Sequence, residues 1–359
     1  MGISVPRQHF LTYLGVAHPI VLAPMAGTGT PSLAAAVSNA GGLGSLAIGA
    51  MTAEAARAAI RELRSLTVQP FNINVFAHKP PKLDRVKEAA WLSFLAPYFA
   101  DFGETAPTEL HTIYPSFVDD DAMLEVLLEA RPAVVSFHFG LPPIERINAL
   151  HDAGCMLFAT ATSLEEALAI EAAGIDVIVA QGIEAGGHRG IFDTAAYDEE
   201  LSTLALVSAL VARTTRPIVA AGGVMNGAGI AAALAGGAQA AQLGTAFIDT
   251  PESAADAAHR AALTQRGSHT VLTSAISGRP ARCVENRFTA LGRDPKRPDI
   301  PDYPIAYDAG KALHAAARRS GEMGYAAHWA GQGHALSRSL GAAALVETLV
   351  AELHAVGMA

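Results

Sequence analysis

The sequence predicts a (β/α)8 TIM barrel, an α/β fold, with an insertion after the third strand and a mainly helical C-terminal cap. Three observations support this fold class. Eight short apolar runs alternate with helical patterns, which is typical of βα units and a parallel sheet. These runs are apolar throughout, as expected for strands that are covered on both faces. Glycines and polar residues follow most of them, which is where a barrel carries its active site.

The predicted strands alternate with helices that begin at residues suited to an N-cap, such as Thr52, Ser163, Ser202 and Asn226. The strands are Pro19–Ala23, Gly44–Ile48, Phe71–Phe76, Ala133–Phe137, Cys155–Ala159, Ile175–Ala180, Pro217–Ala221 and Ala240–Leu243. A doubly wound sheet is the alternative. It is less favoured because no G-x-G-x-x-G motif opens a helix after the first strand.

The segment between the third and fourth strands, residues 77–132, is too long for a simple crossover. It contains helical patterns at Lys82–Ala100 and Asp119–Ala130. We predict that the whole segment is an insertion at the top of the barrel.

The C-terminal part departs from the βα pattern after Pro251–Leu263, which we interpret as the last barrel helix. Gly278–Pro304 is rich in Pro, Arg and Asp and is predicted to be an extended loop. Helices are predicted over Ala306–Ser320 and Leu336–Val356. The expected domains are a barrel over residues 1–265 and a cap or lid over residues 266–359 that contributes to the substrate pocket.

Composition excludes several classes of function. The net charge is −9, and no Lys/Arg cluster is present that could neutralise a nucleic-acid backbone. The two cysteines, Cys155 and Cys283, form no spaced motif, which fits a reducing cytoplasm. Residues 217–248 carry no charge, but seven glycines interrupt them, so a strand, a loop, a short helix and a strand are expected there and no membrane span.

The most informative segment is residues 181–190, QGIEAGGHRG, which directly follows the sixth strand. Gly186 and Gly187 have no Cβ, so their backbone N–H groups are expected to come close to a ligand. His188 is expected to project from the tip of this loop into the same space. The combination favours a reaction centre over an ordinary turn.

Similar groups follow the other strands and are expected at the same rim. Gly222-Gly223 follow the seventh strand and Gly244-Thr245 the eighth, where barrels often hold a phosphate. Tight βα turns, which also suit glycine, are the alternative. His138 ends the fourth strand and is either a catalytic group or a hydrogen-bonded core histidine.

No metal is implied, because the chain has no H-x-x-x-H, no C-x-x-C and no carboxylate pair at ligand spacing. A serine hydrolase is also unsupported, since no G-x-S-x-G occurs.

At these positions the chain resembles the FMN-dependent nitronate monooxygenases, formerly called 2-nitropropane dioxygenases. The resemblance covers about residues 12 to 335. It is carried by Ala23-Pro24-Met25-Ala26-Gly27, Asn74, GIEAGGH at 182–188, AGGV at 221–224 and QLGTAF at 242–247. SFHFG at 136–140 and the polar residues Tyr114, Tyr303 or Tyr307, and Lys311 are similar to the class I form. The superfamily also contains flavin-dependent enoyl-ACP reductases and NADH:quinone reductases.

The resemblance implies FMN as cofactor and an alkyl nitronate, such as propionate 3-nitronate, as an anionic substrate that reacts with O2. The cofactor would be bound by Pro24, Met25, Ala26, Asn74, Gln181, Gly186, Gly187, Gly222, Gly223, Gln242, Gly244 and Thr245. One electron would pass to FMN, and its semiquinone would pass it to O2, giving a carbonyl compound and nitrite. His188, with a pKa near 6.5, would orient the nitronate or act as base on the nitroalkane. Lys311 and Tyr114 would hold the negative nitro oxygens or a substrate carboxylate.

Three alternatives remain open at this point. An NAD(P)H-dependent flavin reductase of the same fold would share every glycine motif, because fold does not determine chemistry. A phosphate-sugar isomerase or synthase would use the same barrel without flavin. A flavin-binding module without turnover is less favoured, because two histidines are predicted at the rim. We expect no nucleic-acid or membrane partner, and a monomer or homodimer.

Overall fold

The computed structural model describes residues 7–357, so both ends of the predicted domain ranges, residues 1–6 and 358–359, lie outside the described residues. Eight parallel strands form one sheet in the order β1-β9-β8-β6-β5-β4-β3-β2, and a bridge between Val21 and Leu43 joins its edges. The strands are β1 (Ile20–Leu22), β2 (Gly44–Ala47), β3 (Phe71–Phe76), β4 (Val134–His138), β5 (Met156–Ala161), β6 (Val177–Gln181), β8 (Ile218–Ala221) and β9 (Ala240–Leu243). The predicted TIM barrel and its eight strands are confirmed.

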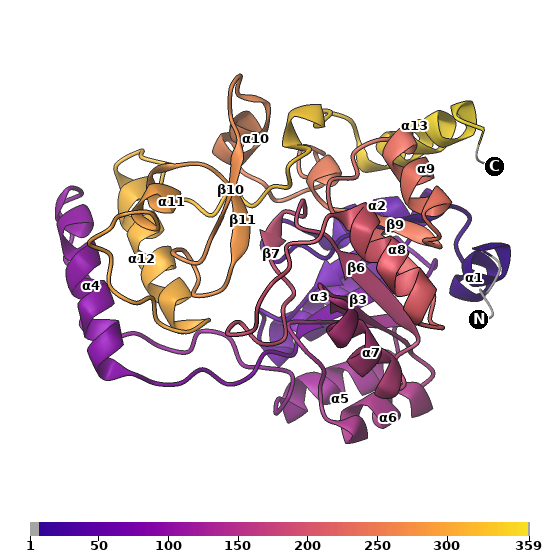
Figure 1. Ribbon diagram of the computed structural model, residues 1–359, viewed down its shortest axis with the longest axis horizontal. Helices are drawn as coiled ribbons and strands as arrows, with labels where there is room; N and C mark the ends of the chain where they lie inside the picture. Colours follow the sequence, from indigo (N-terminus) through magenta and orange to yellow (C-terminus); the bar gives the residue numbers. More distant parts are fainter. Residues whose placement is uncertain (1–6, 358–359) are drawn as a thin grey trace.

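Helices surround the barrel (Figure 1). They are α2 (Pro31–Asn39), α3 (Ala53–Leu66), α5 (Asp121–Ala130), α6 (Ile144–Asp152), α7 (Leu164–Ala172), α8 (Thr203–Arg213) and α9 (Gly227–Ala235). The expected N-caps are present, because Thr52, Ser163, Ser202 and Asn226 each accept a hydrogen bond from a backbone N–H of the first turn. A further helix, α1 (Arg7–Leu14), packs Phe10, Leu11 and Leu14 against side chains from the barrel strands.

The helix that completes the ring is α13 (Ala342–Ala355), near the C-terminus, and the prediction that Pro251–Leu263 fills this place is wrong. α13 packs against α9 and α2 and contributes Leu345, Leu349 and Leu353 to the barrel core. Gly227 permits this approach, since a Cβ there would lie 2.3 Å from the backbone nitrogen of Leu353. α10 (Ala257–Thr264) lies in the cap instead. The division into domains at residue 265 stays a prediction.

The insertion after β3 is shorter than predicted, because α5 belongs to the ring, where it packs between α3 and α6. The other helix of this segment, α4 (Arg85–Ala100), packs on α12 (Ile305–Arg319) at the end of the molecule farthest from the barrel (Figure 1). Trp91 and Leu95 from α4 share an apolar cluster with Leu313 from α12. The insertion and the C-terminal segment therefore build one cap together.

The cap also contains a small antiparallel sheet of β10 (Thr270–Thr273), β11 (Ala281–Val284) and β7 (Gly187–His188). The remaining elements are α11 (Arg287–Leu291) and two short 3-10 helices, η1 (Thr245–Phe247) and η2 (His334–Leu336). The expectation of an extended loop over Gly278–Pro304 is therefore wrong in part. Its polar composition conceals β11, which pairs with the preceding strand β10 and with the distant β7. It also conceals α11, which Asn286 and Thr289 cap reciprocally.

The uncharged segment, residues 217–248, forms β8, α9, β9 and η1, as the interrupting glycines indicated. Within residues 7–357, no helix is long and apolar enough to cross a membrane.

Candidate active site

A cavity of about 500 Å³ lies at the carboxyl ends of the barrel strands, under the cap. Every residue predicted for the site lines it. From the barrel these are Pro24, Met25, Ala26, Asn74, His138, Gln181, Gly186, Gly187, His188, Gly222, Gly223, Gln242, Gly244 and Thr245, and from the insertion and cap Tyr114, Tyr303, Tyr307 and Lys311. The structure brings both sets together, and both Tyr303 and Tyr307 reach the cavity.

His188 lies on a short strand and does not project from a loop tip, so the sequence prediction is wrong on this point. Its backbone pairs with Ala281 of β11, which belongs to the cap. Its carbonyl oxygen accepts hydrogen bonds from Nε2 of His138 at 3.2 Å and from Nε2 of Gln181 at 3.0 Å. Residues from β4, β6 and β11 therefore hold the backbone of His188 in one position.

His138 uses both ring nitrogens within the protein. Nε2 donates to the His188 carbonyl, so the neutral ring accepts from the Thr160 hydroxyl at Nδ1, at 3.0 Å. Of the two roles left open for His138, the geometry corresponds to the hydrogen-bonded core histidine. Gln181 is similarly occupied, because its Oε1 accepts from the backbone N–H of Gly190 at 2.7 Å. The side chains of His138 and Gln181 therefore hold the strand that contains His188 in place.

The ring of His188 is enclosed and neutral. Its Nε2 is 2.8 Å from Oγ of Ser277, whose hydroxyl donates to the carbonyl of Arg279. Nε2 therefore carries the proton, and Nδ1 has no hydrogen-bond partner among residues 7–357. Burial, followed by the neighbouring His138 and the Arg279 guanidinium, lowers the pKa of His188 to about 3. The expected pKa near 6.5 is not what this environment gives.

Glycine is required at different positions of the site for different structural reasons. A Cβ on Gly186 would lie 2.4 Å from the backbone nitrogen of Gly331, so this glycine is required by packing against the cap. The expected reason, close approach of a ligand, is not needed to explain it. Gly222 and Gly223 have φ angles of +127° and +69°, which a side chain would strain. Their positions at the end of β8 depend on this backbone conformation.

The ends of β8 and β9 present unpaired backbone donors. In the described part of the chain, no acceptor is bonded to the N–H groups of Gly222, Gly223, Gly244 or Thr245. The Thr245 hydroxyl oxygen accepts from the N–H of Gly331 at 2.9 Å, so it also joins the barrel to the cap. Converging N–H groups of this kind suit an anion such as a phosphate.

The other end of the cavity is aromatic and cationic. Tyr307 and Lys311 lie one turn apart on α12, and the Lys311 ammonium lies 4.9 Å from the ring centre of Tyr114 and 5.5 Å from that of Tyr307. Burial raises the pKa of Tyr114 to about 12, so its hydroxyl stays protonated and able to donate. No aspartate or glutamate in the described chain lines the cavity. Its electrostatics therefore favour an anion.

Sequence reasoning missed several residues of the cavity. Phe139 packs on the rings of His138 and His188, with ring centres at 4.4 and 5.6 Å, and Trp329 lies 5.0 Å from His188. Ser136 holds Asn74 through its hydroxyl, at 3.0 Å. The S-F-H-F-G segment included Ser136 and Phe139, but nothing in the local pattern marks Trp329, which reaches the site only through the fold of the cap.

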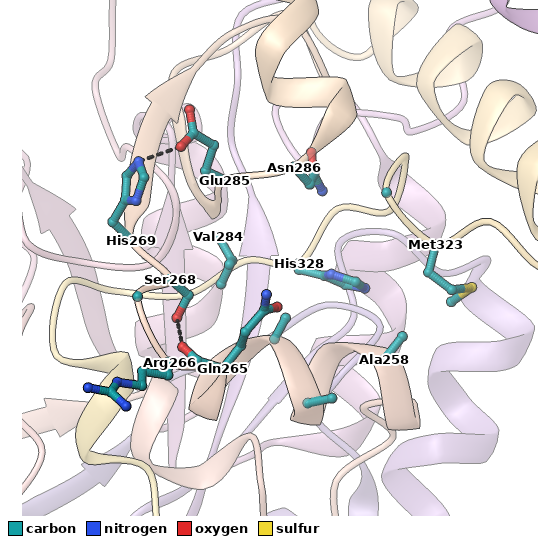
Figure 2. A pocket seen from close by; sticks show the side chains of 14 residues that line it. Ala258, Gln265, Arg266, Ser268, His269, Val284, Glu285, Asn286, Met323 and His328 are labelled. Carbon is teal, nitrogen blue, oxygen red and sulfur yellow. Dashed lines mark hydrogen bonds and ion pairs between the residues drawn. The ribbon is translucent and has the colours of Figure 1, made fainter.

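A second cavity lies in the cap between α10 and the segment that follows β11 (Figure 2). Ala258 and Val284 contribute apolar atoms, and His269 is paired with Glu285 across one side. None of the predicted site residues lines it. Among residues 7–357, no group of three or more His, Cys, Asp or Glu side chains is arranged to hold a metal ion.

The fold and the first cavity define the class: a TIM-barrel protein with an anion-favouring cavity closed by a cap. The family model described as nitronate monooxygenase matches residues 8–352. A nitronate monooxygenase of Paraburkholderia phytofirmans is 58% identical over 97% of this chain and 95% of that protein, and one of Pseudomonas aeruginosa is 54% identical over 96% and 99%. The chain belongs to the nitronate monooxygenase family, whose members are flavin-dependent oxidoreductases.

Solved structures agree with this assignment. The nitroalkane oxidase from Streptomyces ansochromogenes superposes with a TM-score of 0.87 at 43% identity, covering 96% of this chain and 98% of that one. FabK from Thermotoga maritima superposes with a TM-score of 0.72 at 29% identity, covering 97% and 96%.

Proposed function

We propose that this protein oxidises alkyl nitronates, such as propionate 3-nitronate, with O2 to a carbonyl compound and nitrite, using FMN. One observation supports a nitronate, and not a neutral nitroalkane, as the substrate. The cavity offers one cation, Lys311, and several N–H donors but no effective base, because no carboxylate lines it and the pKa of His188 is held at about 3. A substrate that arrives already deprotonated suits this cavity better than a neutral nitroalkane.

The residues present fit FMN as the cofactor. The unpaired N–H groups of Gly222, Gly223, Gly244 and Thr245 form a donor set for its phosphate without a lysine. Asn74, held by Ser136, and Met25 line the part of the cavity that would receive the ring. Gln181 would act indirectly, since both ends of its amide bond to the backbone near His188. Bound FMN would supply the electron transfer between substrate and O2.

The protein's own groups would bind and orient the nitronate. Lys311 and the protonated hydroxyls of Tyr114 and Tyr307 would hold its negative oxygens or a carboxylate. His188 would orient the substrate through the face of its ring, whose position is fixed by the hydrogen bond from Nε2 to Ser277. The aromatic groups of the cap would exclude water from the reacting atoms.

The proposal also includes a cytoplasmic location and the state of assembly. Both cysteines are buried and unpaired, which supports a reducing cytoplasm. We retain a monomer or homodimer as the expected assembly.

Anaerobic mixing of the purified flavoprotein with propionate 3-nitronate in one sample, and with NADH in another, tests the proposal. We expect the visible flavin spectrum to change with the nitronate and to stay unchanged with NADH. Full bleaching by NADH without a response to the nitronate would instead assign the protein to the NAD(P)H-dependent reductases of this fold.

A further inference from the structure

One buried arginine near the cavity lacks the partner that such a group normally has. Four arginines of the described chain are less than 9% exposed: Arg146, Arg189, Arg279 and Arg282. Arg146 pairs with Asp121 at 2.7 Å and Arg189 with Asp198 at 2.8 Å. Neither Arg282 nor Arg279 forms an ion pair within residues 7–357, but Nε of Arg282 donates to the carbonyl of Ile183 at 2.9 Å. The Arg279 guanidinium donates to the carbonyl of Ile191, and its buried Nε is the one Nε of these four arginines without a hydrogen-bond partner.

A buried cation without a counter-charge is costly, because it has lost hydration without gaining an ionic partner. Burial lowers the pKa of Arg279 to about 10, so the guanidinium remains protonated at neutral pH. Glu166 and Asp193 act on this charge electrostatically but form no ion pair with it. The structure therefore contains a buried positive charge without a direct carboxylate partner among residues 7–357.

This charge lies one aromatic ring away from the cavity. Cζ of Arg279 is 4.4 Å from the ring centre of Phe139, and Phe139 lines the cavity. The rings of His138, His188 and Tyr303 pack on Phe139 at centre distances of 4.4, 5.6 and 5.3 Å. The intervening volume is packed side chain, where charges are screened much less than at the surface. The same guanidinium helps to lower the pKa of His138 and His188, so its field reaches the residues of the cavity.

We propose that Arg279 is a specificity-determining residue, whose charge behind Phe139 is balanced by an anion bound in the cavity. This inference rests on the proposed function, since the anion is the nitronate substrate. Arg279 acts through the wall of the cavity without touching the substrate, whereas Lys311 lines the cavity itself and is exposed. The charge of Arg279 would favour an anion in the cavity over a neutral molecule of the same shape.

Nitrate, an inert planar anion, is a suitable probe, and its binding to the flavin-loaded protein can be followed by calorimetry. In Arg279→Met we expect the Kd of nitrate to rise about tenfold, while Arg279→Lys stays within about threefold of the wild type. Neutral 1-nitropropane should bind equally well to all three proteins. With propionate 3-nitronate, KM should rise about tenfold in Arg279→Met and kcat should change less than about twofold.

Arg146→Met is the matched control, since Arg146 is also a buried guanidinium stacked on a phenylalanine, Phe117, at 5.4 Å, but does not line or adjoin the cavity. An unchanged nitrate Kd in Arg279→Met would overturn the inference, as would an equal weakening in Arg146→Met. Equal weakening of nitrate and 1-nitropropane would overturn it as well, because that result indicates distortion of the cavity.

A measurement on the wild type covers the case in which Arg279→Met does not fold. Nitrate should raise the Tm of the flavoprotein more than chloride does at equal ionic strength, because an anion that binds only the folded state stabilises it. Equal Tm values would overturn the inference. If nitronate is not oxidised but nitrate binding still depends on Arg279, the proposed function fails and the anion preference stands.

Discussion

The two walls of the cavity at the carboxyl ends of the barrel strands are built in different ways. The barrel wall, at the ends of β6, β8 and β9, presents mainly backbone N–H groups whose directions follow from glycine conformations and strand register. The cap wall presents side chains, chiefly tyrosines and Lys311, that pack on one another. This difference fits the proposed function. The barrel wall would hold a group that stays the same, the phosphate of the proposed FMN, and the cap wall would bind the substrate, whose recognition can change with the side chains of the cap.

The largest effect we expect comes from three histidines near the meeting of the two walls: His78, which is buried, and His138 and His188, which are half-buried. Burial lowers the pKa of His78 and His138 to about 4 and that of His188 to about 3. The unfolded chain takes up these protons near pH 6.5, whereas the folded protein does not. The free energy of unfolding should therefore be insensitive to these groups above pH 7 and fall by up to about 1.4 kcal/mol per histidine and pH unit between about pH 6 and 4.

Urea unfolding of the wild type at several pH values between 7.5 and 4.5 measures this slope. His78→Gln should reduce the slope by the contribution of one histidine, because it removes one titrating group that does not line the cavity. A slope that is the same in His78→Gln and the wild type would contradict the prediction.

The second effect concerns His188, which both walls hold in place. In His188→Asn we expect FMN to stay bound and kcat/KM for propionate 3-nitronate to fall about a hundredfold, because loss of orientation at the reacting centre is costly. His314→Asn, which alters a histidine outside the cavity, is the control. Unchanged turnover of the nitronate, with a loss confined to neutral nitroalkanes, would show instead that His188 acts as a base.

The third effect tests the barrel wall alone, through its expected binding of FMN. Thr245→Val removes a hydroxyl beside the expected phosphate position and leaves the N–H of Gly331 without its acceptor. We expect the Kd of FMN to rise about tenfold, since loss of one such bond costs about 1.5 kcal/mol. Thr250→Val changes a fully buried threonine that bonds to Phe247 and does not line the cavity. Equal FMN affinity in Thr245→Val and Thr250→Val would count against the phosphate site at β9.

The barrel wall could be predicted from the sequence because its signals are local. Apolar runs mark the strands, and residues at or directly after the strand ends, such as His138 and Gly222, reach the same rim by symmetry of the fold. The same locality explains the mistake about the last barrel helix: the pattern cannot show that α13, far along the chain, fills the place next to α9.

The cap wall could not be derived in this way. Tyr114, Tyr307 and Lys311 were identified only through the family resemblance, since an insertion and a distant helix bring them together. The environment of His188 was missed for the same reason. Its pairing with β11 and its bond to Ser277 join residues about 90 positions apart, and they determine its tautomer and lower its pKa.

The smallest effect concerns the cap wall alone. Lys311 is exposed and bound to no carboxylate in the described chain, so its contribution to anion binding is screened by water. In Lys311→Met we expect KM for propionate 3-nitronate to rise about fivefold, as for loss of about 1 kcal/mol from a partly exposed ionic contact, with the Kd of FMN unchanged. Lys79→Met, which removes an exposed lysine paired with Asp193, is the control. A loss of FMN from Lys311→Met would show that the two walls do not act separately, because a change confined to the substrate side would then have reached the cofactor.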